Sequence, residues 1–405
     1  MRFTNSISAA ALCLCLSFVA LGQVTKQVDC SKGKSINDAI AKLDADKEYI
    51  VEVSGTCTEN VVIANFEGIS LQIVGTPSAI INGVDTSPIL VPVISVSSSR
   101  RVRLANLNVN PIPNSMPPAS PPNGNASGIS MSACRGCLVD AVTVNADRLG
   151  ILWIQSQGGQ LNSTVVVNGV GTATAVANSS DVTLANYAAS GNLVQRSFAG
   201  LNVDGGSRVR LSYNAVKQIQ HFTYGIKVAN ASSVEGAGVC GLPATPQACL
   251  EILDNTWGLR ATSAQATVMS GVTFDANGDG VWVENGGVTS LGPLVNITHS
   301  MGGFGAAGNG ITLTHNSQGS IAAYSPGGVL PPNNITNNTR RGISVATSSS
   351  LQFTGLAGSN MNNVTANIAP DIACDATSVL TGTNTLPAAT VIACTNKDPA
   401  PIPLP

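Results

Sequence analysis

The chain is short of charge and of aromatic residues. Only 10% of its 405 residues are Asp, Glu, Lys or Arg, and 4% are aromatic, whereas an ordinary globular protein carries about 25% charged residues. Coiled coils and helical bundles need many Leu, Glu, Lys and Arg, so the composition excludes them. With 20 basic against 22 acidic residues there is no basic excess, which excludes nucleic acid as an expected partner.

Apolar residues and glycine are abundant instead. Hydrophobic residues make up 43% of the chain, glycine contributes 41 residues, and Asn, Ser, Thr, Val and Ala fill most of the remainder. This content can bury a large core and excludes intrinsic disorder. The composition therefore predicts a large, nearly neutral β protein rich in Val and Gly.

The first 22 residues look like a secretory signal peptide. Arg2 is the only charge before Lys26, an apolar run covers 7–21, and Ala20-Leu21-Gly22 forms a small-x-small cleavage site. The alternative is a membrane anchor, which needs about 20 apolar residues. No later segment is long and apolar enough to span a membrane. We therefore expect a mature protein that is secreted, extracellular or periplasmic, and makes no membrane contact after cleavage.

A short phrase repeats along the chain: Gly, a branched apolar residue, a polar residue and another apolar residue. The phrase begins at Gly128, Gly150, Gly200, Gly225, Gly258, Gly280, Gly310 and Gly342. The steps are 22, 50, 25, 33, 22, 30 and 32 residues. The step of 50 is twice 25, so we expect a missing member near Thr172. Such a period is typical of a solenoid.

Each step suits one coil of two or three short strands. Coils stack through backbone hydrogen bonds about 4.8 Å apart, alternation buries Ile, Val and Leu, and Asn or Gly at the corners can form ladders. We predict an all-β, single-domain right-handed parallel β-helix over 49–395. The alternative is a β-sandwich, which two-residue Asn-Gly or Asp-Gly hairpins would favour. Asn309-Gly310 and Asp279-Gly280 instead open the repeated phrase.

Both ends of a solenoid need caps. Ser35 and Asp38 make a capping-box helix start, and an apolar face follows, so we expect a short capping helix over 36–45 within a cap of 23–48. The last residues, 396–405, form a Pro-rich tail. Two long loops are expected to leave the coils, 111–125 and 236–248.

The cysteines agree with export. Two of the ten, Cys13 and Cys15, lie in the leader, which leaves eight, an even number. In a solenoid only neighbouring segments meet. We therefore predict the disulfides Cys30–Cys57, Cys134–Cys137, Cys240–Cys249 and Cys374–Cys394. The Cys-x-x-Cys at 134–137 could also be a redox motif or half of a zinc site, but neither context is visible.

The segment SINDAIAKLDADKEYIVEVSGTCTENVVI resembles the N-terminal cap of bacterial secreted right-handed β-helix proteins. The Gly-Ile-x-Val phrases after it resemble the pectin-lyase-like superfamily, over roughly residues 30–390. The resemblance implies the fold and a carbohydrate-active or adhesive role. The catalytic motifs of polygalacturonases, pectate lyases and mannuronan epimerases are absent, so no catalytic residue is carried over.

The second residue after each phrase glycine must point outward, and stacking makes these residues a column. That column, here called the outer column, reads Ser130, Leu152, Asn202, Lys227, Arg260, Trp282, Thr312 and Ser344. The fourth residue after each phrase glycine also points outward if the strand continues. In the middle coils the two positions together place these residues on one face: Asn202, Asp204, Lys227, Arg260, Trp282 and Glu284. A Trp beside Lys and Arg suits a sugar ring with a carboxylate. The alternative is an ordinary solvated sheet face.

Catalysis on this face would be of the lyase or epimerase kind. Asp204 and Glu284 are three coils apart, about 14 Å, which is too far for the carboxylate pair of a glycosidase. Lys227 or Tyr224 could act as base with Arg260 neutralising a carboxylate, and His221 could reach the groove. A corner histidine can equally make a structural hydrogen bond.

The residues Asp275-Ala-Asn277-Gly-Asp279-Gly match the start of a calcium loop. The twelfth position is Gly286 instead of Glu, so calcium is a weak hypothesis; no other cofactor is expected. We predict a protein that binds or modifies an acidic polysaccharide. The alternative function is a non-catalytic extracellular scaffold or adhesin.

Overall fold

The computed structural model describes residues 23–398, except for 45, 87–88, 113–125, 147, 241–246, 304, 323–331, 355–361 and 369. The predicted signal peptide, most of the predicted loop 111–125 and the last residues of the predicted tail lie outside this part of the chain. So does the middle of the loop 236–248, whose ends pair as the antiparallel strands β22 (Val239–Cys240) and β23 (Gln247–Ala248).

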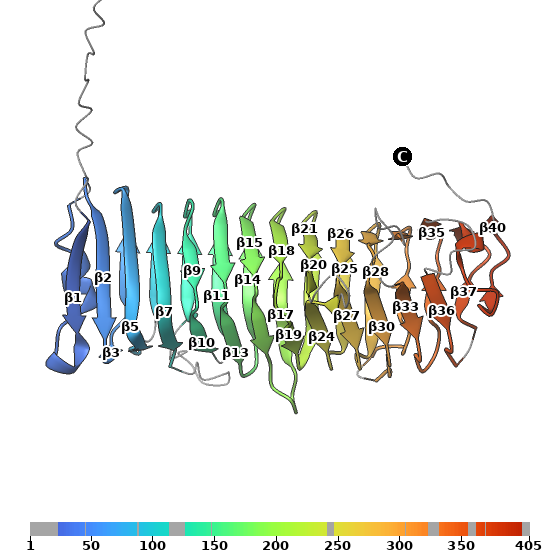
Figure 1. The fold of residues 1–405 in the computed structure, drawn as a ribbon, viewed down its shortest axis with the longest axis horizontal. Helices are drawn as coiled ribbons and strands as arrows, with labels where there is room; N and C mark the ends of the chain where they lie inside the picture. Colours follow the sequence, from blue (N-terminus) through green and yellow to red (C-terminus); the bar gives the residue numbers. More distant parts are fainter. Residues whose placement is uncertain are drawn as a thin grey trace, which may run out of the picture.

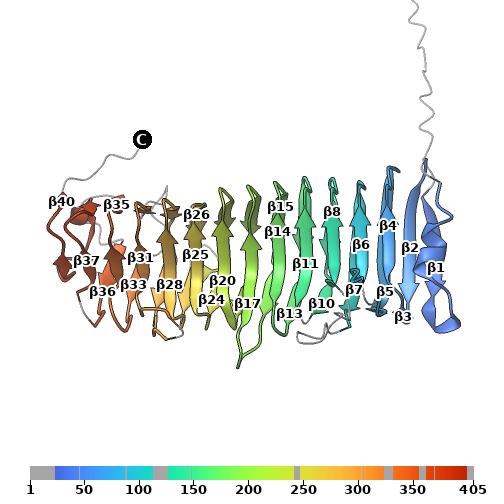
Figure 2. The same cartoon turned by 180° about the vertical axis from the view of Figure 1, so that it is seen from behind.

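The described chain forms a rod of stacked strands (Figures 1 and 2). It is a right-handed parallel β-helix, and its strands run from β1 (Val24–Asp29) to β40 (Lys397–Asp398). One side of the rod is a 13-stranded parallel sheet, here called the front sheet; a 25-stranded sheet wraps the other sides. In chain order the front sheet consists of β4 (Val61–Ala64), β6 (Ile94–Ser97), β8 (Ile129–Ser132), β11 (Leu149–Ile154), β14 (Thr172–Ala177), β17 (Ser197–Val203), β20 (Phe222–Ala229), β25 (Trp257–Thr262), β28 (Asp279–Glu284), β31 (Ile311–Leu313), β34 (Ile343–Val345), β37 (Ile372–Cys374) and β39 (Ile392–Ala393).

One coil shows how the chain winds. After β17 it passes through β18 (Arg208–Ser212) and β19 (Lys217–Gln220) and returns as β20, which pairs with β17. Alternation buries the apolar side chains of each strand, which form one continuous core. The expected missing repeat is confirmed, because β14 begins at Thr172 and lies between β11 and β17.

The repeated glycine has a steric reason. A Cβ placed on Gly225 would lie 2.5 Å from Ile252 Cγ2 and 2.6 Å from the carbonyl oxygen of Gly258 in the next coil. Gly200 and Gly280 show the same crowding. The glycine and the apolar residue after it both face the interior, so alternation is interrupted at this point. Two large residues that precede such a glycine, Tyr224 and Trp257, are half-exposed on the outer side.

Polar ladders fill the corners. The backbone N–H of Ser156 donates to Ser180 Oγ at 3.1 Å, and the N–H of Asn255 donates to Asn277 Oδ1 at 2.9 Å. Both pairs join consecutive coils, so they satisfy buried groups that strands cannot reach. The expected asparagine ladder is confirmed, and a serine ladder accompanies it.

The four predicted disulfides are all present: Cys30–Cys57, Cys134–Cys137, Cys240–Cys249 and Cys374–Cys394. The capping helix is shorter than predicted. The helix α1 covers Ile36–Ile40 instead of 36–45, because the chain turns after Ala41 to enter β2 (Glu48–Ser54). At the other end, β40 adds a strand within the predicted tail, by pairing with β38 (Val379–Thr381).

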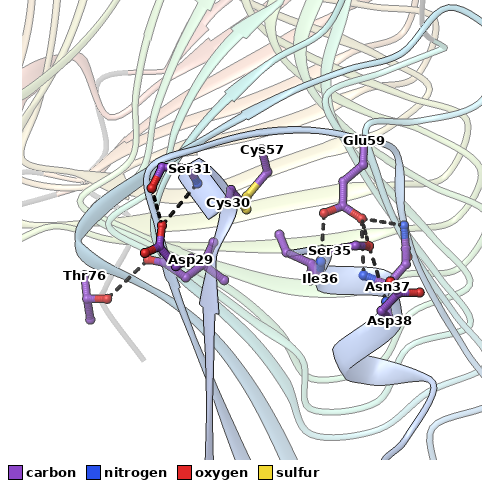
Figure 3. Close-up of a disulfide and its surroundings, with 11 residues drawn as sticks. Asp29, Cys30, Ser31, Ser35, Ile36, Asn37, Asp38, Cys57, Glu59 and Thr76 are labelled. Atoms are coloured by element: carbon purple, nitrogen blue, oxygen red, sulfur yellow. Dashed lines mark hydrogen bonds between the residues drawn. A yellow bond between two sulfur atoms is a disulfide. The ribbon is translucent and has the colours of Figure 1, made fainter. Parts of the chain in front are cut away.

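Glu59 fastens the cap to the first coil (Figure 3). Its carboxylate accepts hydrogen bonds from the N–H groups of Ile36 and Asn37 and from the side chains of Ser35 and Asn37, at 2.8–3.2 Å. Asn37 in turn donates to the carbonyl of Asn60 and accepts from the N–H of Val62. These bonds cover part of the exposed edge of β4, which is what a cap must do.

The steric role of the repeat glycine can be tested by Gly225→Ala. The added methyl overlaps Ile252 and the backbone of the next coil, so we expect a loss of about 1–3 kcal/mol in unfolding free energy. Ala175→Val, which adds bulk at an outward position of the same sheet, is the control and should change stability little. Urea unfolding followed by circular dichroism measures both; equal midpoints would contradict this account of the repeat.

The cap can be tested by Glu59→Gln. Losing the charge weakens the hydrogen bonds from the start of α1, so we expect the free energy of opening the cap to fall by roughly 1–2 kcal/mol, with no change in the central coils. Amide hydrogen exchange should accelerate over 36–40 and stay unchanged in the central coils. Glu67→Gln, at a carboxylate that pairs with Arg100 at the surface, is the control. Unaltered exchange in α1 would show that Glu59 does not hold the cap.

Candidate functional site

The outer column exists as predicted. The Cα partners along the front sheet are Asn202, Lys227, Arg260, Trp282, Thr312 and Ser344. Ala175 of the missing repeat also belongs to it, between Leu152 and Asn202. From Leu152 to Trp282 the members are half-buried. Parallel stacking thus brings Lys227, Arg260 and Trp282 side by side on one face.

A second, aromatic column lies beside the outer column and was missed in the sequence. Tyr224 and Trp257 are Cα partners, and their rings stack with centroids 5.1 Å apart. Phe198, which is 41% exposed, meets Tyr224 edge-on at 5.3 Å. Tyr224 and Trp257 each precede a phrase glycine, where the alternation of inward and outward residues is interrupted. This shared position was the sequence signal that could have predicted the aromatic column.

Two cations of the outer column lie over these rings. Lys227 Nζ is 4.9 Å from the ring centre of Phe198, and the Arg260 guanidinium carbon is 5.0 Å from that of Trp257. The same two groups lie 5.5 and 5.6 Å from the centre of Tyr224. The faces of Tyr224 and Trp257 are therefore already in contact with protein groups, which leaves less ring surface for a ligand.

Glu284 connects the site. Its Oε1 accepts hydrogen bonds from Arg260 at 2.7 and 3.0 Å and from Thr262 at 2.8 Å, and its Oε2 accepts the Trp282 indole N–H at 3.0 Å. Burial raises the pKa of Glu284, but hydrogen bonds from Arg260 and Thr262 lower it by more, so the pKa lies below its ordinary value. Glu284 is consequently an ionised anchor and not a proton donor.

The network leaves Trp282 and Lys227 as the groups best placed for a ligand. Trp282 is half-buried, and its indole is held by Glu284. Among the described residues, no carboxylate forms an ion pair with Lys227, whereas Arg260 is paired with Glu284. Lys227 is therefore a cation without an ion-pair partner among the described residues, on the same face as an indole held by Glu284.

The other predicted residues lie at the margins. Asp204 accepts hydrogen bonds from the N–H of Gly205 and from Asn230, both at 2.7 Å, at the turn after β17. Asn202 is half-buried next to Lys227 and has an Oδ1 without a partner among the described groups. His221 lies at the corner between β19 and β20, with Nε2 3.7 Å from Asp254 Oδ2.

The calcium-loop residues are engaged by the protein. Asn277 belongs to the asparagine ladder, Asp275 accepts from His299 at 2.7 Å, and the buried Asp279 accepts from the N–H of Asn309 at 2.7 Å. Elsewhere in the described chain, the one group of possible metal ligands is Cys30, Cys57 and Glu59, whose sulfurs form a disulfide.

The arrangement offers cation binding, ring contact and a phenol, Tyr224, that could take a proton in its ionised form. Tyr224 Oη accepts a hydrogen bond from Arg260 at 3.2 Å, and Lys227 lies near the same ring. Three of the four residues predicted for catalysis, Tyr224, Lys227 and Arg260, are thus brought together. A carboxylate bound by the cations could place an acidic carbon next to the phenol oxygen.

The lowered pKa of Glu284 gives a test of the network. Since its folded-state pKa is depressed, the stabilisation that it provides is present above the ordinary Glu value of 4.5 and is lost only as the pH falls through the lowered pKa. We expect the fluorescence of Trp282, taken as the difference between wild type and Trp282→Phe, to change with pH in a transition whose midpoint lies below 4.5. In Glu284→Gln this transition should be missing; a transition centred above pH 4.5 in the wild type would contradict the network.

No protein-family model and no curated protein sequence matches the chain. Among solved structures, it is similar to a mutant of the periplasmic alginate epimerase AlgG, with 9% identity, a TM-score of 0.50, and 93% of this chain and 85% of that chain covered. It is also similar to the A-module of the Azotobacter vinelandii mannuronan C-5 epimerase AlgE6, with 12% identity, a TM-score of 0.42, and 91% and 94% covered.

The catalytic domain of a GH87 alpha-1,3-glucanase is a third similar structure, with 11% identity, a TM-score of 0.42, and 92% of this chain and 68% of that chain covered. Of these three, AlgG alone reaches a TM-score of 0.5. At 9% identity this likeness shows a shared fold, the parallel β-helix. Among the described residues, no helix is long and apolar enough to cross a membrane.

Proposed function

We propose that the protein binds an acidic polysaccharide on the front sheet, with Lys227 and Trp282 as the principal contacts. The observation that carries the proposal is the combination of a cation that no described carboxylate neutralises with an indole fixed in place by Glu284. A side chain that is already ordered loses little entropy when it binds. Sugar rings have apolar faces that pack on indole, and their carboxylates pair with lysine.

The geometry favours an acidic chain over a neutral one. Lys227 and Trp282 are two coils apart, roughly 10 Å at about 4.8 Å per coil, so they would meet different units of one chain. Glu284 would repel an anion, but Arg260 neutralises it at 2.7 Å. The likeness to the alginate epimerase AlgG supports an acidic polysaccharide as ligand for a protein of this fold.

A modifying activity is the second candidate. Tyr224, Arg260 and Lys227 form a phenol beside two cations. In its ionised, phenolate form Tyr224 could take the proton next to a sugar carboxylate and become a neutral phenol, while the cations stabilise the negative charge left on the sugar, as lyases and epimerases require. We assign Tyr224 the role of base and Lys227 the role of neutraliser, because Arg260 is already paired with Glu284.

The place of action would be outside the cytoplasm. The predicted signal peptide at 1–22 and four disulfides fit an oxidising compartment. The competing function is a rod that displays or spaces other molecules without binding sugar. In that case the front sheet would be an ordinary polar surface, and its residues could be exchanged without consequence.

Lys227→Gln and Trp282→Ala test the binding proposal. We expect Trp282→Ala to weaken binding of polygalacturonate or alginate by roughly 1–3 kcal/mol through lost ring contact. Lys227→Gln should weaken binding and reduce its salt dependence, because a screened ion pair is removed. Lys217→Gln, on β19 away from the front sheet, is the matched control. Isothermal titration calorimetry at several salt concentrations gives both quantities.

Three outcomes separate the candidates. Absence of wild-type binding to either acidic polymer would favour the rod. Binding that both variants retain at full affinity would move the site elsewhere. A rise in absorbance at 235 nm or new reducing ends, abolished by Tyr224→Phe while binding persists, would establish the modifying activity.

A further inference from the structure

Six of the twelve arginines in the sequence gather on one side of the rod. They lie where the chain leaves a front-sheet strand and enters the 25-stranded sheet, before or within β7 (Val102–Asn110), β9 (Leu138–Asp140) and β18. The six are Arg100, Arg101, Arg103, Arg135, Arg208 and Arg210. In a chain with only 10% charged residues, this concentration of cations points to a role.

Four of the six arginines are paired with carboxylates of a neighbouring coil. The ion pairs are Arg100–Glu67 at 3.2 Å, Arg103–Asp140 at 2.6 Å, Arg208–Glu235 at 2.5 Å, and Arg210 with both Asp181 and Glu235 at 3.2 Å. Each of these arginines therefore has its charge balanced within the fold, and the role of the cluster depends on the other two.

Arg101 and Arg135 are the two that the protein leaves open. Both are exposed, and no carboxylate within the described part of the chain forms an ion pair with either of them. Their backbones lie side by side in successive coils, because the N–H of Arg101 donates to the carbonyl of Arg135 at 3.0 Å. Like charges rooted so close together repel each other, and an anion that contacts both guanidinium groups removes that repulsion.

The corner that carries Arg135 is fixed in place. Cys134 and Cys137 form a disulfide and are 0% and 1% exposed, so they face the interior, whereas Arg135 and Gly136 between them are exposed. The N–H groups of Arg135 and Gly136 donate to carbonyls of the coils on either side, both at 2.9 Å. The Cys-x-x-Cys motif thus holds an arginine at a defined place on the surface.

Two neighbouring guanidinium groups favour a particular kind of anion. A carboxylate has two oxygens, and the planar fork of one arginine can bind both of them. A sulfate or phosphate ester has three terminal oxygens, so it can accept hydrogen bonds from two forks at once. Two unpaired arginines in successive coils therefore fit an ester of this kind better than a carboxylate.

We infer that Arg101 and Arg135 form a second anion-binding site, which takes a sulfate or phosphate ester carried by a polymer. The site is separate from the one on the front sheet. Arg135 follows β8, and Lys227 lies on β20, four coil steps further along the rod, roughly 19 Å at about 4.8 Å per coil. The inference consequently does not depend on the proposed function.

Dextran derivatives of equal length and equal degree of substitution test the site. Dextran sulfate, dextran phosphate, carboxymethyl dextran and plain dextran are titrated by calorimetry into the full-length Lys227→Gln protein, in which the front-sheet cation no longer contributes. We expect the preferred ester to bind roughly tenfold more tightly than carboxymethyl dextran, and plain dextran not to bind. The tighter of the two ester derivatives identifies whether the site takes sulfate or phosphate.

Substitutions in the same background test the two arginines. Arg101→Gln and Arg135→Gln should each weaken binding of the preferred ester by roughly tenfold and reduce its salt dependence. Arg135→Lys keeps the charge but loses the planar fork, so we expect a loss of roughly threefold. Arg208→Gln is the matched control, because it removes the same charge from the same side of the rod but at an arginine that Glu235 already neutralises. It should leave the affinity unchanged.

The contrary outcomes are distinct. Absence of binding to both ester derivatives overturns the second site and leaves the proposed function on the front sheet standing. Equal affinity for carboxymethyl dextran overturns the preference for a group with three oxygens. An equal loss in Arg208→Gln and Arg135→Gln would show that diffuse positive charge attracts the polymer, and full affinity in Arg135→Lys would show that the guanidinium fork is not used; either result overturns the site.

Discussion

Parallel stacking of successive coils is the constraint on which the rest of the structure depends. Each coil must repeat the backbone path of the one before it, because the hydrogen bonds run between coils about 4.8 Å apart. The interior therefore accepts glycine where two sheets approach closely, as at Gly225, and serine or asparagine at the corners. The same repetition turns single outward residues into columns, which is how a chain with 10% charged residues concentrates cations on one face.

Within that frame, Glu284 organises the site. Arg260, Thr262 and Trp282 all donate to its carboxylate. The pairing neutralises Arg260 and orders the indole, so that Lys227 keeps the charge that a ligand would meet. A glutamate that the sequence suggests as a ligand contact is thus an internal support for the residues around it.

The fold and the outer column could be predicted because both follow from local periodicity. The repeated phrase fixes the register, and the register places Lys227, Arg260 and Trp282 together. The aromatic column could not be predicted from strict alternation, since the phrase glycine adds an inward residue and moves Tyr224 and Trp257 to the outside. The length of the capping helix was also wrong. The helix ends where the chain must turn to enter β2, and the apolar pattern of the segment does not determine that point.

The hydrogen-bond partners of Asp279 and Glu284 also could not be predicted from the sequence. Asp279 reads as part of a calcium loop, yet its carboxylate accepts N–H groups of residues 28 and 30 positions later in the chain. Such contacts depend on how a loop folds back over a coil.

The most direct test of the central claim is a crystal structure of the protein with an oligogalacturonate bound. The account predicts sugar density on the front sheet, with one ring against Trp282 and a carboxylate at Lys227 Nζ. Density on the 25-stranded sheet and none at Lys227 and Trp282 would contradict it.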